Sequence, residues 1–191
     1  MQSGTIRPDR PLLVVALSDE AEMLDSDLPI LITGMGKVNA ALALTAVLAA
    51  GPRPSALINL GTAGSLRGGI TGTHEVSRVI QHDIDARALY TLTGHLVGPP
   101  LTVAERGLTL ASGDQFVAEE TTRTRLADHA HLVDMEGYAL ATVASHFSVP
   151  IRLIKHVSDQ AGSTAAATWQ QNLHQCARAL ATWLRDNRHH Q

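Results

Sequence analysis

Short aliphatic stretches alternate with longer helical ones along most of this chain, and that alternation restricts its fold more than any other feature. Apolar runs typical of strands occupy residues 12–17, 29–33, 56–60, 73–81, 108–111 and 151–157. The glycine-bearing stretch 61–64 that follows the third run is expected to be a loop. Helical patterns occupy residues 38–50, a stretch from about 119, 136–147 and 165 to about 187. Because helices that alternate with strands cover both faces of a sheet, we predict a three-layer α/β/α sandwich with a mixed central sheet.

Composition favours one globular domain that spans residues 1–191. Hydrophobic residues make up 45% of the chain and aromatic residues only 3%, so the core must come from Leu, Val, Ile and Ala. The formal net charge is -3, which provides no basic surface to attract nucleic acid or acidic lipid. The first apolar stretch is too short for a signal sequence or a membrane span. We therefore expect a cytoplasmic protein with no nucleic-acid or membrane partner.

The sequence does not support three familiar kinds of site. Gly34 and Gly36 open a helix, but Asn39 stands where a dinucleotide-binding motif needs Gly or Ala, so a tight turn is the better interpretation. Ten histidines are present without a metal-binding HExxH motif. No serine lies in a G-x-S-x-G turn, and Cys176 has no setting that would activate its thiol. We expect no metal and no cofactor.

Carboxylates stand at or just beyond the carboxyl ends of several expected strands. Glu20 follows the first strand, Glu136 lies where an extended segment turns into a helix, and Asp159 follows the last strand. Sheets of this class bind ligands beyond those ends, so the topology would group acids that are distant in sequence. Taken singly, each acid has an ordinary explanation as a helix-start or turn residue.

Six segments, taken together and in order, resemble the nucleoside phosphorylase and nucleosidase superfamily. The likeness is greatest to its bacterial 5'-methylthioadenosine/S-adenosylhomocysteine nucleosidases. The segments are residues 16–20, 34–41, 58–64, 112–116, 133–137 and 157–159, with a weaker match at 82–85. The likeness runs from about residue 12 to residue 185, and such collinear agreement is far more specific than any one motif.

The resemblance implies a role for each acid. Glu20 matches the acid that orients and deprotonates the attacking water, and Glu136 matches the acid that hydrogen-bonds the ribose hydroxyls. Asp159 matches the residue that helps to protonate the purine, which makes the base a better leaving group. A carboxylate near the ribose would also stabilise the positive charge that develops on the sugar.

The same resemblance implies an apolar substrate pocket. Phe116 would lie against the base and Met135 near the ribose, while the backbone of Val117 would read the purine edge. The other substrate-binding positions that it implies are Thr62, Ala63, Gly64 and Ser158. Thr62 stands where serine is common and Lys155 where arginine is common, so the hydroxyl and the charge are kept.

Anion binding distinguishes hydrolysis from phosphorolysis. Phosphorylases of the superfamily carry an arginine where this chain has Asn59, and another in the first glycine-containing loop, whereas residues 17–22 contain no cation. A phosphate near Asp19 and Glu20 would meet like charge. We therefore predict an enzyme that hydrolyses the N-glycosidic bond of 5'-methylthioadenosine, S-adenosylhomocysteine or a related adenine nucleoside to free base and sugar.

Three alternatives remain open: a phosphate-dependent purine nucleoside phosphorylase, another purine N-ribohydrolase, and a ligand-binding module without turnover. Retention of all three acids speaks against the binding module. The chain is shorter than usual for the family, because residues 24–29 replace a longer hairpin and residues 89–108 are abbreviated. Since the family's pocket for the 5' substituent uses the second region of a neighbouring subunit, the 5' group is left open.

Assembly is expected to follow the family, as a homodimer related by a two-fold axis. Residues 84–106 are expected to contain a loop over a site. The abbreviated segment 89–108 has apolar side chains that a monomer would struggle to cover. They are Leu89, Tyr90, Leu92, Leu96 and Val97. The alternative is that this segment folds back on its own core.

Overall fold

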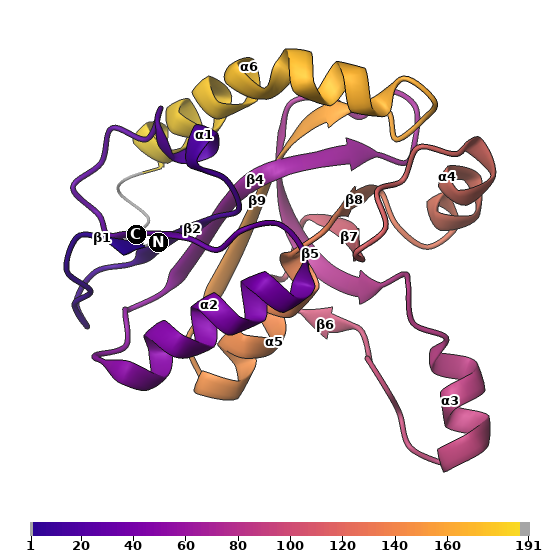
Figure 1. The fold of residues 1–191 in the computed structure, drawn as a ribbon, viewed down its shortest axis with the longest axis horizontal. Coiled ribbons are helices and arrows are strands. Elements are labelled where there is room, and N and C mark those ends of the chain that lie inside the picture. Colours follow the sequence, from indigo (N-terminus) through magenta and orange to yellow (C-terminus); the bar gives the residue numbers. More distant parts are fainter. Residues whose placement is uncertain (1, 188–191) are drawn as a thin grey trace.

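A computed structural model describes residues 2–187 and confirms the layered α/β architecture (Figure 1). Helices α1 (Ser18–Ala21) and α6 (Ala165–Asp186) cover one face of the sheet, and α2 (Lys37–Ala50) and α5 (Gly137–Phe147) cover the other. Two further helices, α3 (Ala86–Thr93) and α4 (Glu120–Ala127), lie beyond one end of the sheet. No helix within the described range is long and apolar enough to cross a bilayer.

Within residues 2–187, nine strands form one mixed sheet. They are β1 (Gln2–Ser3), β2 (Leu12–Val15), β3 (Ile30–Ile32), β4 (Leu57–Ser65), β5 (Thr73–Gln81), β6 (Leu101–Thr102), β7 (Leu108–Ser112), β8 (Leu132–Asp134) and β9 (Ile151–Asp159). Strands β4, β9, β5, β7 and β8 pair in that order, and β8 pairs back with β4, so these strands close into a ring. Strands β2, β3 and β1 extend the sheet from β4, and β6 lies at its other edge.

Alternate residues of β4 face opposite helical layers. Leu57 packs in the apolar cluster beneath α2 and α5, whereas Ile58 and Leu60 pack with Leu180 and Leu184 of α6. All five side chains are almost completely buried. A strand buried on both faces reads as a continuous apolar run, which explains why residues 56–60 carry no polar alternation.

The structure of residues 61–64 and of residues 84–106 differs from what the sequence predicts. The segment from Gly61 to Gly64, expected as a loop, continues β4, because its partner β9 runs alongside it to Asp159. Residues 84–106, expected as a loop over a site, contain α3 and β6, and α3 extends away from the rest of the molecule (Figure 1). Asp85 caps α3 by accepting a hydrogen bond from Ala88 N at 2.9 Å, and Gly94 ends it with φ 71°.

The suggestion that this segment folds back on its own core is also wrong for α3 and the residues just after it, although Leu101 and Val103 do pack against the core. Helix α3 has no buried residue. Tyr90, Leu92 and Leu96 are exposed, the last two by about 80% of their surface. The segment therefore presents apolar side chains outward.

Candidate active site

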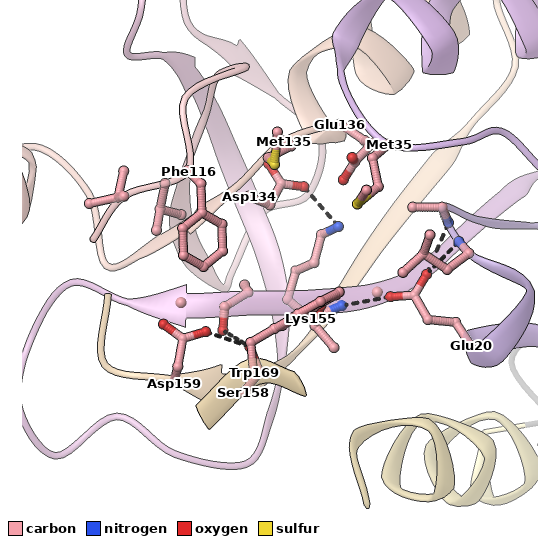
Figure 2. Close-up of a pocket in the computed structure, with 18 of the residues that line it drawn as sticks. Glu20, Met35, Phe116, Asp134, Met135, Glu136, Lys155, Ser158, Asp159 and Trp169 are labelled. Atoms are coloured by element: carbon pink, nitrogen blue, oxygen red, sulfur yellow. Dashed lines mark hydrogen bonds and ion pairs between the residues drawn. The ribbon is translucent and has the colours of Figure 1, made fainter. Parts of the chain in front are cut away.

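A cavity of about 550 Å³ lies where β4, β8 and β9 end near α6 (Figure 2). The structure brings together in its wall every site residue that the sequence suggested. They are Glu20, Thr62, Ala63, Gly64, Phe116, Val117, Met135, Glu136, Ser158 and Asp159. Figure 2 shows Glu20 and Asp159 at opposite ends of the cavity, with the Lys155 side chain between them.

Glu20 is held by three backbone N–H groups. Its Oε2 accepts from Ala16 N at 3.0 Å and Leu17 N at 3.1 Å, and its Oε1 accepts from Thr62 N at 3.2 Å. Burial raises the pKa of Glu20, although these hydrogen bonds and the charge of Lys155 oppose the rise. A fixed carboxylate with a raised pKa is suited to accept a proton from water.

Glu136 immediately precedes α5, and its carboxylate crosses to the start of α2. Oε1 accepts from Gly36 N at 2.8 Å, and the side chain is buried. Burial and the nearby charge of Asp134 raise the pKa of Glu136 to about 7, against the opposing effects of Lys155 and the Gly36 N–H. The carboxylate therefore gains or loses its proton near neutral pH.

Asp159 is placed by an irregularity in the pairing of β4 with β9. Ala63 pairs with Val157 and Gly64 with Asp159, so Ser158 is the extra residue of a β-bulge. Ser158 Oγ donates to Asp159 Oδ2 at 2.8 Å, and Ala161 N donates to Oδ1 at 2.8 Å. A Cβ on Gly64 would lie 3.0 Å from Asp159 Oδ1, so glycine provides the room for this carboxylate.

Lys155 and Asp134 form a fully buried ion pair in the cavity wall. Lys155 Nζ lies 2.8 Å from Asp134 Oδ2, which also accepts from Gly137 N at 2.9 Å. Burial alone would lower the pKa of Lys155, but the charges of Asp134, Glu136 and Glu20 raise it, so the ammonium stays charged. Residues 17–22 contain no cation, but Lys155 on β9 is near enough for its charge to act on Glu20. That charge is already paired with Asp134.

Apolar side chains form most of the remaining wall. Phe116, Met135 and Met35 surround the cavity in Figure 2, and Phe116 and Met35 are exposed enough to lie at its mouth. The side chain of Val117 is buried in the adjacent core. An aromatic ring and two thioethers offer a planar base an apolar surface with polar groups at its ends.

Helix α6 contributes wall residues that the sequence did not suggest. Trp169 Nε1 donates to Thr62 Oγ1 at 3.1 Å, and Ala166 and Gln170 lie beside it in the lining. The sequence predicts the helix but not which of its side chains reach β4. A tryptophan near the start of an otherwise amphipathic helix was the available signal.

Charge in the cavity wall is strongly unbalanced. Four carboxylates line it, those of Glu20, Asp134, Glu136 and Asp159, and Lys155 is the one Lys or Arg among the described lining residues. Among residues 2–187 no group of three or more His, Cys, Asp or Glu side chains could hold a metal ion. The described part of the wall therefore offers a bound anion no free Lys or Arg, because Lys155 is already paired with Asp134.

Comparison of the sequence with known proteins agrees with this geometry. Residues 25–104 and 101–185 match the phosphorylase superfamily. A 5'-methylthioadenosine/S-adenosylhomocysteine nucleosidase of Anoxybacillus flavithermus is 30% identical over 172 residues, which cover 76% of this chain and 73% of that protein. One from a Geobacillus species is 30% identical over 183 residues, which cover 82% and 78%.

Solved structures share the fold. A futalosine hydrolase mutant of Helicobacter pylori superimposes with a TM-score of 0.80 at 22% identity, covering 93% of this chain and 97% of that one. The 5'-methylthioadenosine/S-adenosylhomocysteine nucleosidase of Helicobacter pylori, bound to butyl-thio-DADMe-Immucillin-A, gives 0.80 at 20% identity, covering 96% and 99%. At these identities the likeness establishes the fold.

Proposed function

Because this chain belongs to the phosphorylase superfamily, we propose that it is a nucleosidase that hydrolyses the N-glycosidic bond of an adenine nucleoside. Relatives named as 5'-methylthioadenosine/S-adenosylhomocysteine nucleosidases support the reaction. The observation that carries the proposal is the position of Glu20 and Asp159 at opposite ends of one cavity, with Glu136 in its wall (Figure 2).

In the proposed reaction, Asp159 protonates the purine as its bond to the sugar breaks. The base then leaves with the bonding electron pair, and the ribose develops oxocarbenium character. Glu136 holds the ribose hydroxyls and stabilises this charge, while Glu20 accepts a proton from the water that attacks the anomeric carbon. The products are free adenine and free sugar.

Hydrolysis is favoured over phosphorolysis by the charge of the cavity wall. A phosphate dianion would lie among four carboxylates, and the ammonium of Lys155 is already bound to Asp134. Asn59, buried on β4, donates from Nδ2 to Val14 O at 3.0 Å and carries no positive charge. A neutral water avoids the repulsion that phosphate would meet.

The wall also bears on the 5' substituent. Met35, Phe116 and Trp169 present apolar surface, and the described lining has no unpaired Lys or Arg to bind an anionic 5' group. An uncharged thioether matches such a surface. We therefore place 5'-methylthioadenosine first among the substrates, and S-adenosylhomocysteine second, with its amino-acid end in the open mouth.

A homodimer would cover the apolar side chains that the monomer exposes. Tyr90, Leu92 and Leu96 point outward from the α3 region, and Val38 and Leu42 do so from α2, next to Met35 at the cavity mouth. Sedimentation at micromolar concentration tests the dimer, and an active monomer of 20.3 kDa would refute it. A cytoplasmic location stays a prediction.

Substrate choice is tested by free-base release from a panel of purine nucleosides. The panel contains 5'-methylthioadenosine, S-adenosylhomocysteine, adenosine and inosine. We expect the highest kcat/KM for 5'-methylthioadenosine and little release of hypoxanthine from inosine. Tight binding of adenine nucleosides without base release under any condition would instead identify a binding module.

A further inference from the structure

Three segments that are distant in sequence meet in a closed ring of hydrogen bonds outside the cavity. Lys37 begins α2, Asp83 follows β5, and Asp114 follows β7. Lys37 Nζ lies 2.6 Å from Asp83 Oδ1, and Asp83 Oδ2 accepts from Asp114 N at 2.8 Å. Asp114 Oδ1 then accepts from Lys37 N at 2.7 Å, so each residue of the ring contacts both others.

The Lys37 and Asp83 side chains of the ring are partly sheltered from solvent, whereas Asp114 is exposed. The Lys37 and Asp83 side chains are 18% and 20% exposed, and Lys37 Nζ also donates to Gln81 Oε1 at 2.9 Å. Partial burial would raise the pKa of Asp83, but its hydrogen bonds from Lys37 and Asp114 hold that pKa below its usual value. A sheltered network keeps its geometry better than an isolated surface ion pair does.

The ring is adjacent in sequence to the residue that holds Glu136, the carboxylate proposed to bind the ribose. Gly36 N, the amide next to Lys37 N, donates to Glu136 Oε1 at 2.8 Å. Successive N–H groups at the start of α2 thus hold Glu136 and Asp114, where the helix dipole favours negative charge. A Cβ on Gly36 would lie 3.1 Å from Asp114 Oδ1, and the φ of 92° also favours glycine.

The ring is also close in sequence to a second part of the cavity wall. Phe116, which lines the cavity, is two residues beyond Asp114. The loop lies tightly against the end of β5, because a Cβ on Gly113 would come within 2.5 Å of His82 Nε2. None of the ring residues lines the cavity itself.

We propose that Lys37 is a positioning residue, and that the Lys37–Asp83–Asp114 ring clamps the loop carrying Phe116 against the start of α2. The clamp fixes the separation between the wall that faces the base and the carboxylate that faces the ribose before substrate binds. When the pocket walls are already ordered, substrate binding is not opposed by the free energy needed to order them. The inference rests on the proposed nucleosidase function.

Breaking the ring should weaken substrate binding more than it slows chemistry. We expect Lys37→Met to raise KM for 5'-methylthioadenosine about tenfold, with kcat changed less than about threefold. Lys37→Arg should restore KM, because a guanidinium can still reach Asp83. Asp83→Asn should behave like Lys37→Met, and the double variant should be no worse than either single one, because one ring is already open.

Arg152→Met is the matched control, because it breaks a half-buried ion pair to Glu75 between β9 and β5, away from the cavity. It should leave KM unchanged. A wild-type KM in folded Lys37→Met or Asp83→Asn, or additive losses in the double variant, would overturn the clamp. If Lys37→Met fails to fold, Asp83→Asn decides.

The clamp and the proposed function can fail separately. If the wild-type protein releases no base, the same variants are compared by calorimetric titration with adenine. A similar loss of affinity in Lys37→Met and Asp83→Asn, absent in Arg152→Met, would then support the clamp alone. Equal adenine affinity in all variants would overturn it.

Discussion

Lys155 Nζ lies 2.8 Å from Asp134 Oδ2, and both side chains are only 1% exposed. Asp134 Oδ1 also accepts from the Ser112 hydroxyl, so the buried carboxylate has partners for both oxygens. The pair anchors the end of β8 to β9 directly before Met135 and Glu136 enter the cavity wall. A buried pair of this kind is satisfied as a unit and costly when one partner is removed.

Lys155→Met should therefore lower the free energy of unfolding by about 3–5 kcal/mol, because it leaves the Asp134 charge buried and uncompensated. Urea unfolding measures the loss. Arg185→Met is the control, because its contact with Asp186 is long and exposed and should contribute almost nothing. Equal stability of Lys155→Met and the wild type would show that the pair does not stabilise the fold.

Asp159→Asn should reduce kcat about 10²–10⁴-fold with the fold intact, because an amide keeps the shape of the side chain but cannot supply the catalytic proton. Its Oδ1 can still accept from Ala161 N. Steady-state kinetics and near-ultraviolet circular dichroism are the measurements. Wild-type turnover by a correctly folded variant would remove Asp159 from the mechanism.

Glu20→Gln should lose hydrolysis while it retains nucleoside binding, because the change removes the base for water and not a sugar contact. It should also cost stability, since three backbone N–H groups converge on the carboxylate and an amide nitrogen cannot accept from them. In the wild type, kcat/KM should fall as the pH drops through the raised pKa of Glu20. A variant that mainly weakens binding would contradict this role.

Glu136→Gln should stabilise the protein at alkaline pH while it impairs ribose binding. The folded-state pKa is raised from 4.5 to about 7, so the stabilising contribution of Glu136 is complete below its unfolded pKa and is lost as pH rises through 7. The free energy of unfolding of Glu136→Gln relative to the wild type should rise between about pH 5 and pH 8, by at most about 3 kcal/mol. If the difference in unfolding free energy between Glu136→Gln and the wild type does not change over this range, ionisation of Glu136 does not destabilise the folded protein.

Most of the fold was predictable because strands and helices in a layered sheet carry strong apolar periodicity. β5 has the predicted bounds, and α2, α5 and α6 begin and end within a residue of theirs. The loop predicted at residues 61–64 was wrong, because a glycine-rich stretch indicates a loop unless a partner strand is known. The helix within residues 84–106 was not predicted, because it is short and has no buried face, although Asp85 and Gly94 cap its two ends.

The positions of Glu20 and Asp159 after strands singled them out in the sequence, but the roles of the acids could be named only through the collinear resemblance to a family. Chain topology then places Glu20, Glu136 and Asp159 around one cavity. The contacts that depend on side-chain reach could not be read in advance. Trp169 bonding to Thr62, and Lys155 pairing with Asp134, join residues far apart in sequence without any local pattern.

Product analysis with 5'-methylthioadenosine, in phosphate-free buffer and again with phosphate added, tests the proposed hydrolysis most directly. Four carboxylates line the cavity and its ammonium is already paired, so water should be the nucleophile. We predict free adenine and free 5-methylthioribose at a rate that phosphate does not increase. Base release that requires phosphate and yields a sugar 1-phosphate would contradict hydrolysis.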